Sequence, residues 1–131
     1  MKNHINNAQK SIYKREYSMA LTQIYSIYHR FYAAKRKIIL SYSNKSFLQI
    51  ANSDCVRYKN WRTSFYSVDN KAEEILKIIE NHSASSGKKF VTADGDNILK
   101  NARAMRNHCN LFASMRKITE KTNKEEEYEK K

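Results

Sequence analysis

Basic and aromatic residues alternate along two stretches of the chain, and this alternation is its strongest chemical signal. The eight candidate binding residues are Tyr25, Arg30, Tyr32, Arg36 and Lys37 in the first stretch, and Arg57, Lys59 and Arg62 in the second, where Tyr58 and Trp61 lie between them. Lysine and arginine side chains neutralise phosphates, while aromatic rings stack on unpaired bases. This combination favours single-stranded or irregular RNA or DNA over a duplex read through its grooves. We therefore predict that these eight residues form a nucleic-acid-binding surface.

The charge of the chain also favours a polyanionic partner. The 131 residues include 25 lysines and arginines against 13 aspartates and glutamates, which gives a formal net charge of +12. Residues 1–70 hold 12 of the basic residues and only 3 of the acidic ones. Small soluble domains usually carry a net charge of about 2–8, so solubility alone does not account for this excess. The alternative to nucleic acid is an acidic protein partner, with the chain acting as a protein–protein interaction module or an inhibitor.

Arg103 and His108 carry a second possible chemistry, because they have the spacing Arg-x4-His near the end of a helical sequence. In size, expected helix count and motif position, the chain resembles the HEPN family of helical ribonucleases. The resemblance implies that His108 acts as general acid or base and that Arg103 stabilises the phosphorane charge, across a dimer. Ala104 stands where that family usually has a polar residue. We expect a non-enzymatic protein and keep the ribonuclease as an alternative.

Other catalytic and metal chemistry has little support in the sequence. It contains no Gly-rich phosphate loop, nucleophile elbow or HExxH motif. Cys55, His108 and Cys109 are too few and wrongly spaced for a zinc site. We expect no metal, no cofactor and no small-molecule substrate, and we expect both cysteines to be reduced thiols.

The elements that position these residues are helices. Residues 11–40 contain neither Gly nor Pro, and they predict one long helix. Its apolar stripe repeats at steps of three, four and seven residues, through Tyr17, Leu21, Ile24, Tyr28, Phe31 and Ile38. The opposite face collects basic residues, including Arg30, Arg36 and Lys37. This helix needs other helices to cover its stripe, since a rod of this length is unstable alone.

Helical spacing resumes after a polar segment in which Ser43, Asn44 or Ser46 could cap the next helix. We expect this helix to break near residues 67–70, where Asn70 and Glu73 resemble a capping box. A single helix over residues 46–81 is the alternative. A loop around Gly87 precedes the last helix, which continues to about residue 118.

These elements predict an all-α fold, a compact bundle of about four helices with a long first helix. We expect its core to bury six residues from the periodic stripes, namely Ile24, Phe31, Trp61, Phe65, Ile75 and Met105. We divide the chain into a flexible N-terminus at 1–10, the bundle at 11–118 and a charged tail at 119–131. No run of 18 apolar residues occurs and the N-terminus lacks an apolar core, so we expect a cytoplasmic protein without membrane contact. The last helix also has apolar residues outside its main apolar stripe, namely Leu111, Met115 and Ile118. These suggest a contact with a protein partner or a homo-oligomer. The function we expect is nucleic-acid binding as an accessory subunit of a larger nucleoprotein complex.

Overall fold

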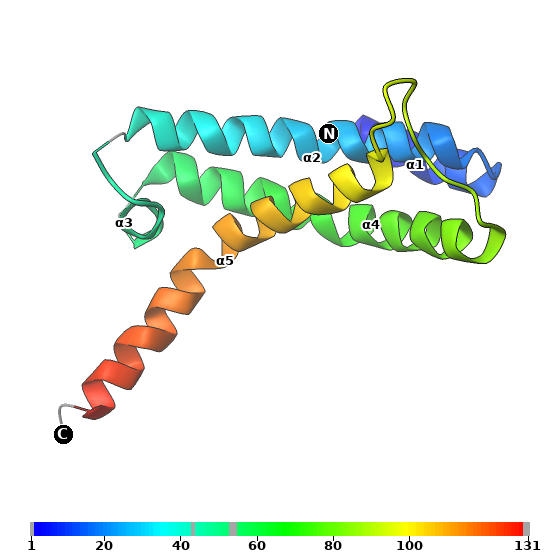
Figure 1. The fold of residues 1–131 in the computed structure, drawn as a ribbon. Coiled ribbons are helices and arrows are strands. Elements are labelled where there is room, and N and C mark those ends of the chain that lie inside the picture. Colours follow the sequence, from blue (N-terminus) through cyan, green and yellow to red (C-terminus); the bar gives the residue numbers. More distant parts are fainter. Residues whose placement is uncertain (1, 43, 53–54, 130–131) are drawn as a thin grey trace.

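The computed structural model describes residues 2–42, 44–52 and 55–129, with side chains at all of these except residues 2, 47, 52 and 115–129. Five helices follow one another along the chain (Figure 1): α1 (Lys2–Tyr13), α2 (Tyr17–Ser41), α3 (Phe47–Asn52), α4 (Val56–Ser86) and α5 (Ile98–Glu129). Within these residues no strand forms, and one isolated bridge joins Val91 to Asn97 in the loop before α5. The prediction of an all-α helical bundle is confirmed.

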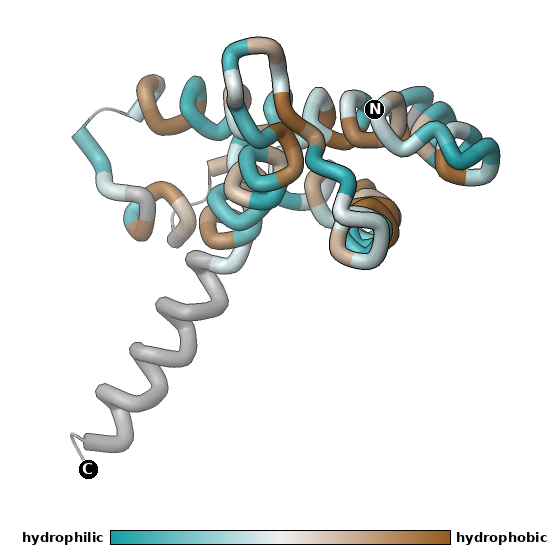
Figure 2. The backbone as a smooth tube through the Cα atoms, turned by 45° about the vertical axis from the view of Figure 1, so that its right-hand side comes forward, coloured by the Kyte–Doolittle hydropathy of each residue, from teal (hydrophilic) through white to brown (hydrophobic). Residues whose placement is uncertain are grey.

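Helix α2 lies at the centre of the bundle, because α1, α4 and α5 all pack against it. In Figure 1, α2 and α4 run side by side while α5 crosses them. The apolar stripe predicted for this helix is buried from Leu21 to Ile38. Hydropathy alternates within the turns of the helices in Figure 2, as amphipathic helices require. None of the described helices combines the length and the apolar character needed to cross a membrane.

Aromatic rings fill the space between α2 and α4. The Trp61 ring stacks on Phe65 with a centroid separation of 5.2 Å, and Phe31 meets both rings edge-on. Five residues predicted to be in the core are buried, namely Ile24, Phe31, Trp61, Phe65 and Ile75. Met105 is only partly buried at the edge of this core, so that part of the prediction is wrong.

The N-terminus differs from the prediction of a flexible segment at 1–10 followed by one helix over 11–40. Helix α1 begins at Lys2, and its Ile5 and Ala8 are buried against the bundle. The chain then turns at residues 14–16, and α2 begins only at Tyr17. The apolar positions of α1 are few, but their spacing of three to four residues places them on one face. Packing of that face on α2 and α4 stabilises a helix whose own sequence is weakly helical.

Helix α4 also differs from its prediction, because it continues through residues 67–70 without a break. Buried Val68, Ala72 and Ile75 carry its apolar stripe across the expected boundary. Glu73 does not cap a helix but pairs with arginines of α5. The alternative of one helix over 46–81 is also wrong, since α3 ends at Asn52 and α4 starts at Val56.

Two helix ends follow the local sequence. Ser46 and Gln49 form a capping box at the start of α3, where each side-chain oxygen accepts the other residue's backbone N–H, at 2.8 and 3.3 Å. Helix α4 ends at Ser86, and the following Gly87 has a φ of 73°, a left-handed conformation that favours glycine. The side chains of the predicted tail at 119–131, and of Met115 and Ile118, lie outside the described residues.

Candidate nucleic-acid interface

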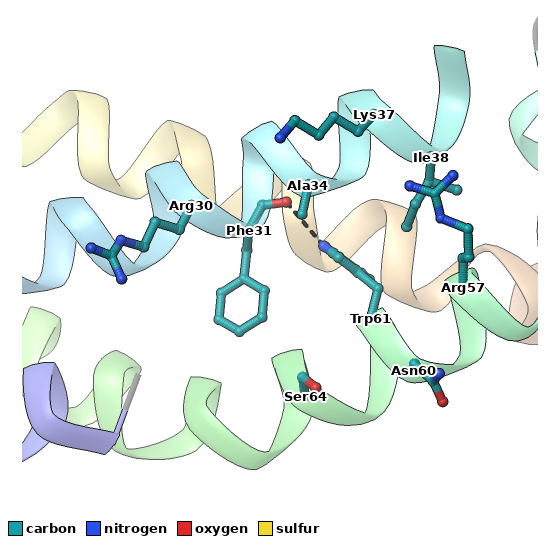
Figure 3. Close-up of a pocket in the computed structure, with 9 residues that line it drawn as sticks. All are labelled: Arg30, Phe31, Ala34, Lys37, Ile38, Arg57, Asn60, Trp61 and Ser64. Carbon is teal, nitrogen blue, oxygen red and sulfur yellow. Dashed lines mark hydrogen bonds between the residues drawn. The ribbon is translucent and has the colours of Figure 1, made fainter. Parts of the chain in front are cut away.

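Three of the predicted basic residues line one groove between α2 and α4 (Figure 3). Arg30 and Lys37 are seven residues apart on α2 and share a face, and Arg57 comes from the start of α4. The groove has a volume of about 440 Å³ and is lined by Arg30, Phe31, Ala34, Lys37, Ile38, Arg57, Asn60, Trp61 and Ser64. None of these lining residues is acidic. We call this feature the basic groove.

The floor of the basic groove is part of the hydrophobic core. Phe31 and Trp61 are buried there, and the Trp61 indole Nε1 donates a hydrogen bond of 2.9 Å to the backbone carbonyl oxygen of Phe31. Ala34 and Ile38 extend the apolar lining along α2. Because the floor is fixed by close contacts, the three cations project from rigid helices rather than from loops.

Arg57 spans the gap between the two helices. Its Nη1 donates a hydrogen bond of 2.7 Å to Ser41 Oγ, and that hydroxyl donates in turn to the backbone carbonyl oxygen of Lys37 at 2.8 Å. The carbonyl groups at the C-terminal end of α2 carry partial negative charge, which favours a cation at this position. Arginine has five N–H donors, and this contact uses one of its terminal nitrogens. The guanidinium can therefore be held by α2 while it also donates to a phosphate.

Arg36 and Tyr32 face a second groove, on the other side of α2. This second groove has a volume of about 510 Å³ and is lined by Tyr32, Lys35, Arg36, Ile39, Leu40 and His108. The Tyr32 and His108 rings meet there with a centroid separation of 6.0 Å. Arg36 and Lys37, although adjacent in sequence, therefore line different grooves.

Lys35 in the second groove is a buried cation that the sequence analysis did not single out. Its Nζ donates to the backbone carbonyl oxygen of His108 at 3.4 Å and lies 5.5 Å from the Phe112 ring centroid. Burial lowers the pKa of Lys35, because desolvation penalises the ammonium form. Helical spacing gave a weak indication that Lys35 is buried, since it lies four residues after buried Phe31 and three before buried Ile38.

The remaining predicted residues lie outside the basic groove. Tyr25 packs against the core, with its ring 6.0 Å from that of His29. The Arg62 guanidinium lies 5.6 Å from the Tyr66 ring centroid, and Lys59 is exposed on α4. The eight residues predicted as one surface are thus divided, and only Arg30, Lys37 and Arg57 share the basic groove.

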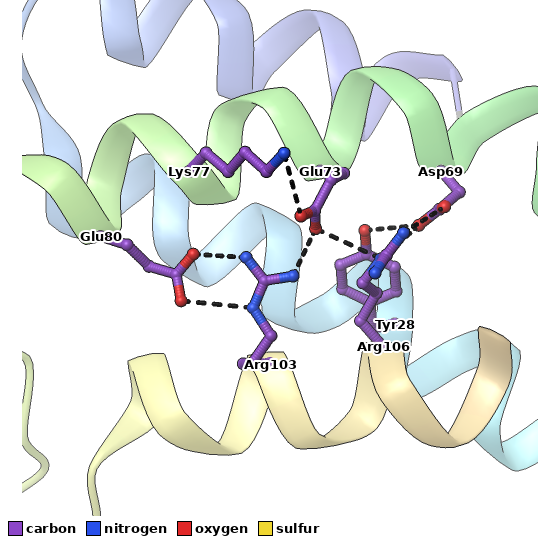
Figure 4. Close-up of polar contacts among 7 residues, drawn as sticks. All are labelled: Tyr28, Asp69, Glu73, Lys77, Glu80, Arg103 and Arg106. Carbon is purple, nitrogen blue, oxygen red and sulfur yellow. Dashed lines mark hydrogen bonds and ion pairs between the residues drawn. The ribbon is translucent and has the colours of Figure 1, made fainter. Parts of the chain in front are cut away.

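Three carboxylates of α4, those of Asp69, Glu73 and Glu80, face α5 instead of this groove (Figure 4). The Arg106 guanidinium donates two hydrogen bonds of 3.0 Å to Asp69, and the Tyr28 hydroxyl donates to the same carboxylate at 2.9 Å. Arg103 forms ion pairs with Glu73, at 2.6 Å, and with Glu80. Burial and the Asp69 charge raise the pKa of Tyr28 far above its usual value. These pairs neutralise three acidic residues within the bundle.

The two residues of the Arg-x4-His motif, Arg103 and His108, have different surroundings in the structure. Arg103 is engaged by Glu73 and Glu80 between α4 and α5. His108 lies beside Tyr32 in the second groove. Five residues correspond to a rotation of about 140° around a helix, so the two side chains leave α5 in different directions. The structure does not bring them into one site.

Metal ligation finds no support in the described part of the chain, where His, Cys, Asp and Glu form no group of three or more that could hold an ion. Cys55 and Cys109 are free thiols and both are buried, as expected for reduced cysteines.

Helical spacing could have identified more of the basic groove than the sequence analysis did. Asn60, Trp61 and Ser64 follow Arg57 at steps of three, four and seven residues, and all four line the groove. Tyr13 was also missed, because residues up to 10 were expected to be flexible and the long helix was expected to run past it. This residue is 91% exposed.

Comparison with protein-family models, curated proteins and solved structures gave no match for this chain.

Proposed function

We propose that this chain is a non-enzymatic nucleic-acid-binding protein that holds the backbone of RNA or single-stranded DNA in its basic groove, as an accessory subunit of a larger nucleoprotein complex. One observation carries the proposal. Arg30, Lys37 and Arg57, from two helices, line one groove whose lining contains no carboxylate. Cations arranged in this way attract a phosphate chain and release its counterions.

The distribution of acidic residues supports this function. Asp69, Glu73 and Glu80 pair with arginines of α5, so these carboxylates do not screen the basic groove. Helix α2 contains no acidic residue, and α4 has none before Asp69. An apolar floor also lowers the local dielectric and strengthens the field of the cations above it.

The salt dependence of binding tests the proposal. Three phosphate contacts predict a slope of log affinity against log salt of about −2 on a fluorescently labelled single-stranded RNA. The triple variant Arg30→Ala, Lys37→Ala, Arg57→Ala should lose most of this slope, measured by fluorescence anisotropy. A control with the same loss of charge is Lys77→Ala, Lys89→Ala, Lys100→Ala, because these three exposed lysines lie outside the basic groove. Equal binding by the two triple variants would contradict the proposal.

A protein partner is the second candidate, and exposed apolar residues on α2, α4 and α5 favour it. Leu40 is 71% exposed at the end of α2, and Val56 is 66% exposed directly before Arg57. Leu111 on α5 is also exposed, which agrees with its proposed role in a protein contact. Such side chains contribute little to phosphate binding but fit an acidic, partly apolar protein surface or a second copy. Sedimentation at several concentrations tests self-association, and a lack of nucleic-acid binding at about 0.15 M salt would favour this candidate.

A further inference from the structure

The last residue of α1, directly before the turn to α2, has an aromatic ring that lies outside the core. Tyr13 is 91% exposed at the end of α1, whereas Tyr25 and Tyr32 are partly buried against the bundle. A ring that is fixed on a helix and open to solvent on both faces can stack on another planar group. Tyr13 therefore has a freedom to stack that Tyr25 and Tyr32 lack.

The surroundings of Tyr13 are basic and polar. A hollow of about 400 Å³ on the outer face of α1 is lined by Asn6, Gln9, Lys10, Tyr13 and Lys14. Their spacing places them on one face of α1, and buried Ile5 and Ala8 hold another face against the bundle. The lining offers two ammonium groups and two side-chain amides, and it includes no carboxylate.

Arg15 follows Lys14 in the turn after α1, where it is exposed and has an unfavourable backbone conformation. The backbone N–H of Arg15 donates to Ile12 and that of Glu16 to Ser11, so α1 ends in a Schellman motif. Arg15 occupies the left-handed position of this motif, with φ 60°, where glycine is favoured. Glu16 is the one carboxylate between residues 10 and 16, against three basic residues. Strained residues of this kind concentrate at functional sites.

We propose that the basic corner, formed by Lys10, Tyr13, Lys14 and Arg15, binds an unpaired nucleotide. Tyr13 stacks on the base, while the three cations contact the neighbouring phosphates. Asn6 and Gln9 offer amide donors and acceptors to the base or the sugar. The inference rests on the proposed function and narrows it to a single-stranded ligand, because a duplex keeps its bases inside the stack.

The test compares a labelled oligouridine with a duplex RNA of equal length. Tyr13→Ala should weaken single-strand binding by about 5- to 160-fold and leave duplex binding unchanged. Tyr13→Phe should bind both probes like the unmodified protein, because the ring is kept. Tyr66→Ala removes another exposed tyrosine, outside the basic corner, and should have no effect. Circular dichroism verifies that each variant is folded.

The outcomes separate this inference from the proposed function. If the unmodified protein binds neither probe, the proposed function fails and the basic corner fails with it. If it binds oligouridine and the basic-groove triple variant does not, but Tyr13→Ala binds normally, only the basic corner is overturned. Equal weakening of single-strand and duplex binding by Tyr13→Ala would also overturn it, as would displacement of oligouridine by polyglutamate as effectively as by unlabelled RNA.

Discussion

The indole Nε1 of Trp61 donates a hydrogen bond of 2.9 Å to the backbone carbonyl oxygen of Phe31, and this contact joins α4 to α2 at the floor of the basic groove. The two rings also meet edge-on, with centroids 6.0 Å apart. The residues that set the distance between Arg57 and the α2 cations are therefore core residues. A change in this core should alter both stability and the shape of the basic groove.

Substitutions at this contact should destabilise the protein in a graded way. Trp61→Phe keeps an aromatic ring but removes the indole donor, so we expect the free energy of unfolding to fall by about 1–3 kcal/mol. Phe31→Ala leaves a cavity beneath α2 and should cost about 3–5 kcal/mol. Urea unfolding monitored by circular dichroism measures both values. A Phe31→Ala protein of nearly full stability would show that this ring does not support the core.

The α2 stripe and the core positions Ile24, Phe31 and Trp61 could be predicted, because apolar residues recur at helical spacing within each of these segments. Helix α1 could not, because its buried face is small and its order depends on packing against α2 and α4. The candidate site was predictable only in part. Arg36 and Lys37 are adjacent residues, and which groove each one lines depends on the helices that flank α2. The spacing of residues along α2 does not indicate which helices pack on either side of it.

Arg15→Gly should stabilise the protein. A left-handed conformation costs a residue with a Cβ about 1–2 kcal/mol, and glycine adopts it without this cost. Because glycine also gains entropy in the unfolded chain, we expect a net increase of about 1 kcal/mol in the free energy of unfolding. Arg15→Ala is the control, since it removes the same charge but keeps the Cβ, and it should not stabilise. Equal urea midpoints for the two variants would contradict this account.

Arg106→Ala should be more harmful than Arg103→Ala. Arg106 is the guanidinium partner of the buried Asp69. Its removal leaves that carboxylate with the hydrogen bond from the Tyr28 hydroxyl but without a cation bound to it. Loss of one partner from a buried pair costs about 3–5 kcal/mol. Arg103 pairs with Glu73 and Glu80. After its removal Glu73 keeps Arg106 and Lys77 as partners, and Glu80 is accessible enough to water to be hydrated. Chemical unfolding of the two variants provides the comparison, and an equal loss would contradict the distinction.

The stability of the protein should fall at alkaline pH through Cys109. Burial raises the pKa of this thiol from 9.0 to about 12, although Lys35 opposes the shift. The folded state therefore retains a proton that the unfolded state releases. This contribution is complete below about pH 9 and is lost as the pH rises towards 12, by up to about 1.4 kcal/mol per pH unit.

Cys109→Ala isolates this effect, because the raised pKa of Tyr28 acts equally in both proteins. We expect the stability difference between the unmodified protein and the variant to shrink between about pH 9 and pH 11, measured by urea unfolding under reducing conditions. A difference that is constant over this range would show that the thiol does not titrate with unfolding.

Lys37 and Arg36 form a matched pair for locating the nucleic-acid interface. Both are exposed cations on α2, but Lys37 lines the basic groove and Arg36 lines the second groove beside His108. Lys37→Ala should reduce the magnitude of the salt slope on single-stranded RNA by about 0.7, the value for one lost phosphate contact. Arg36→Ala should reduce this slope less, since the charge of Arg36 acts on the basic groove only through screened solvent.

Lys37→Arg is the control. It keeps the charge and should have the same salt slope as the unmodified protein. Equal reductions from the two alanine variants would show instead that the interface extends across α2 into both grooves.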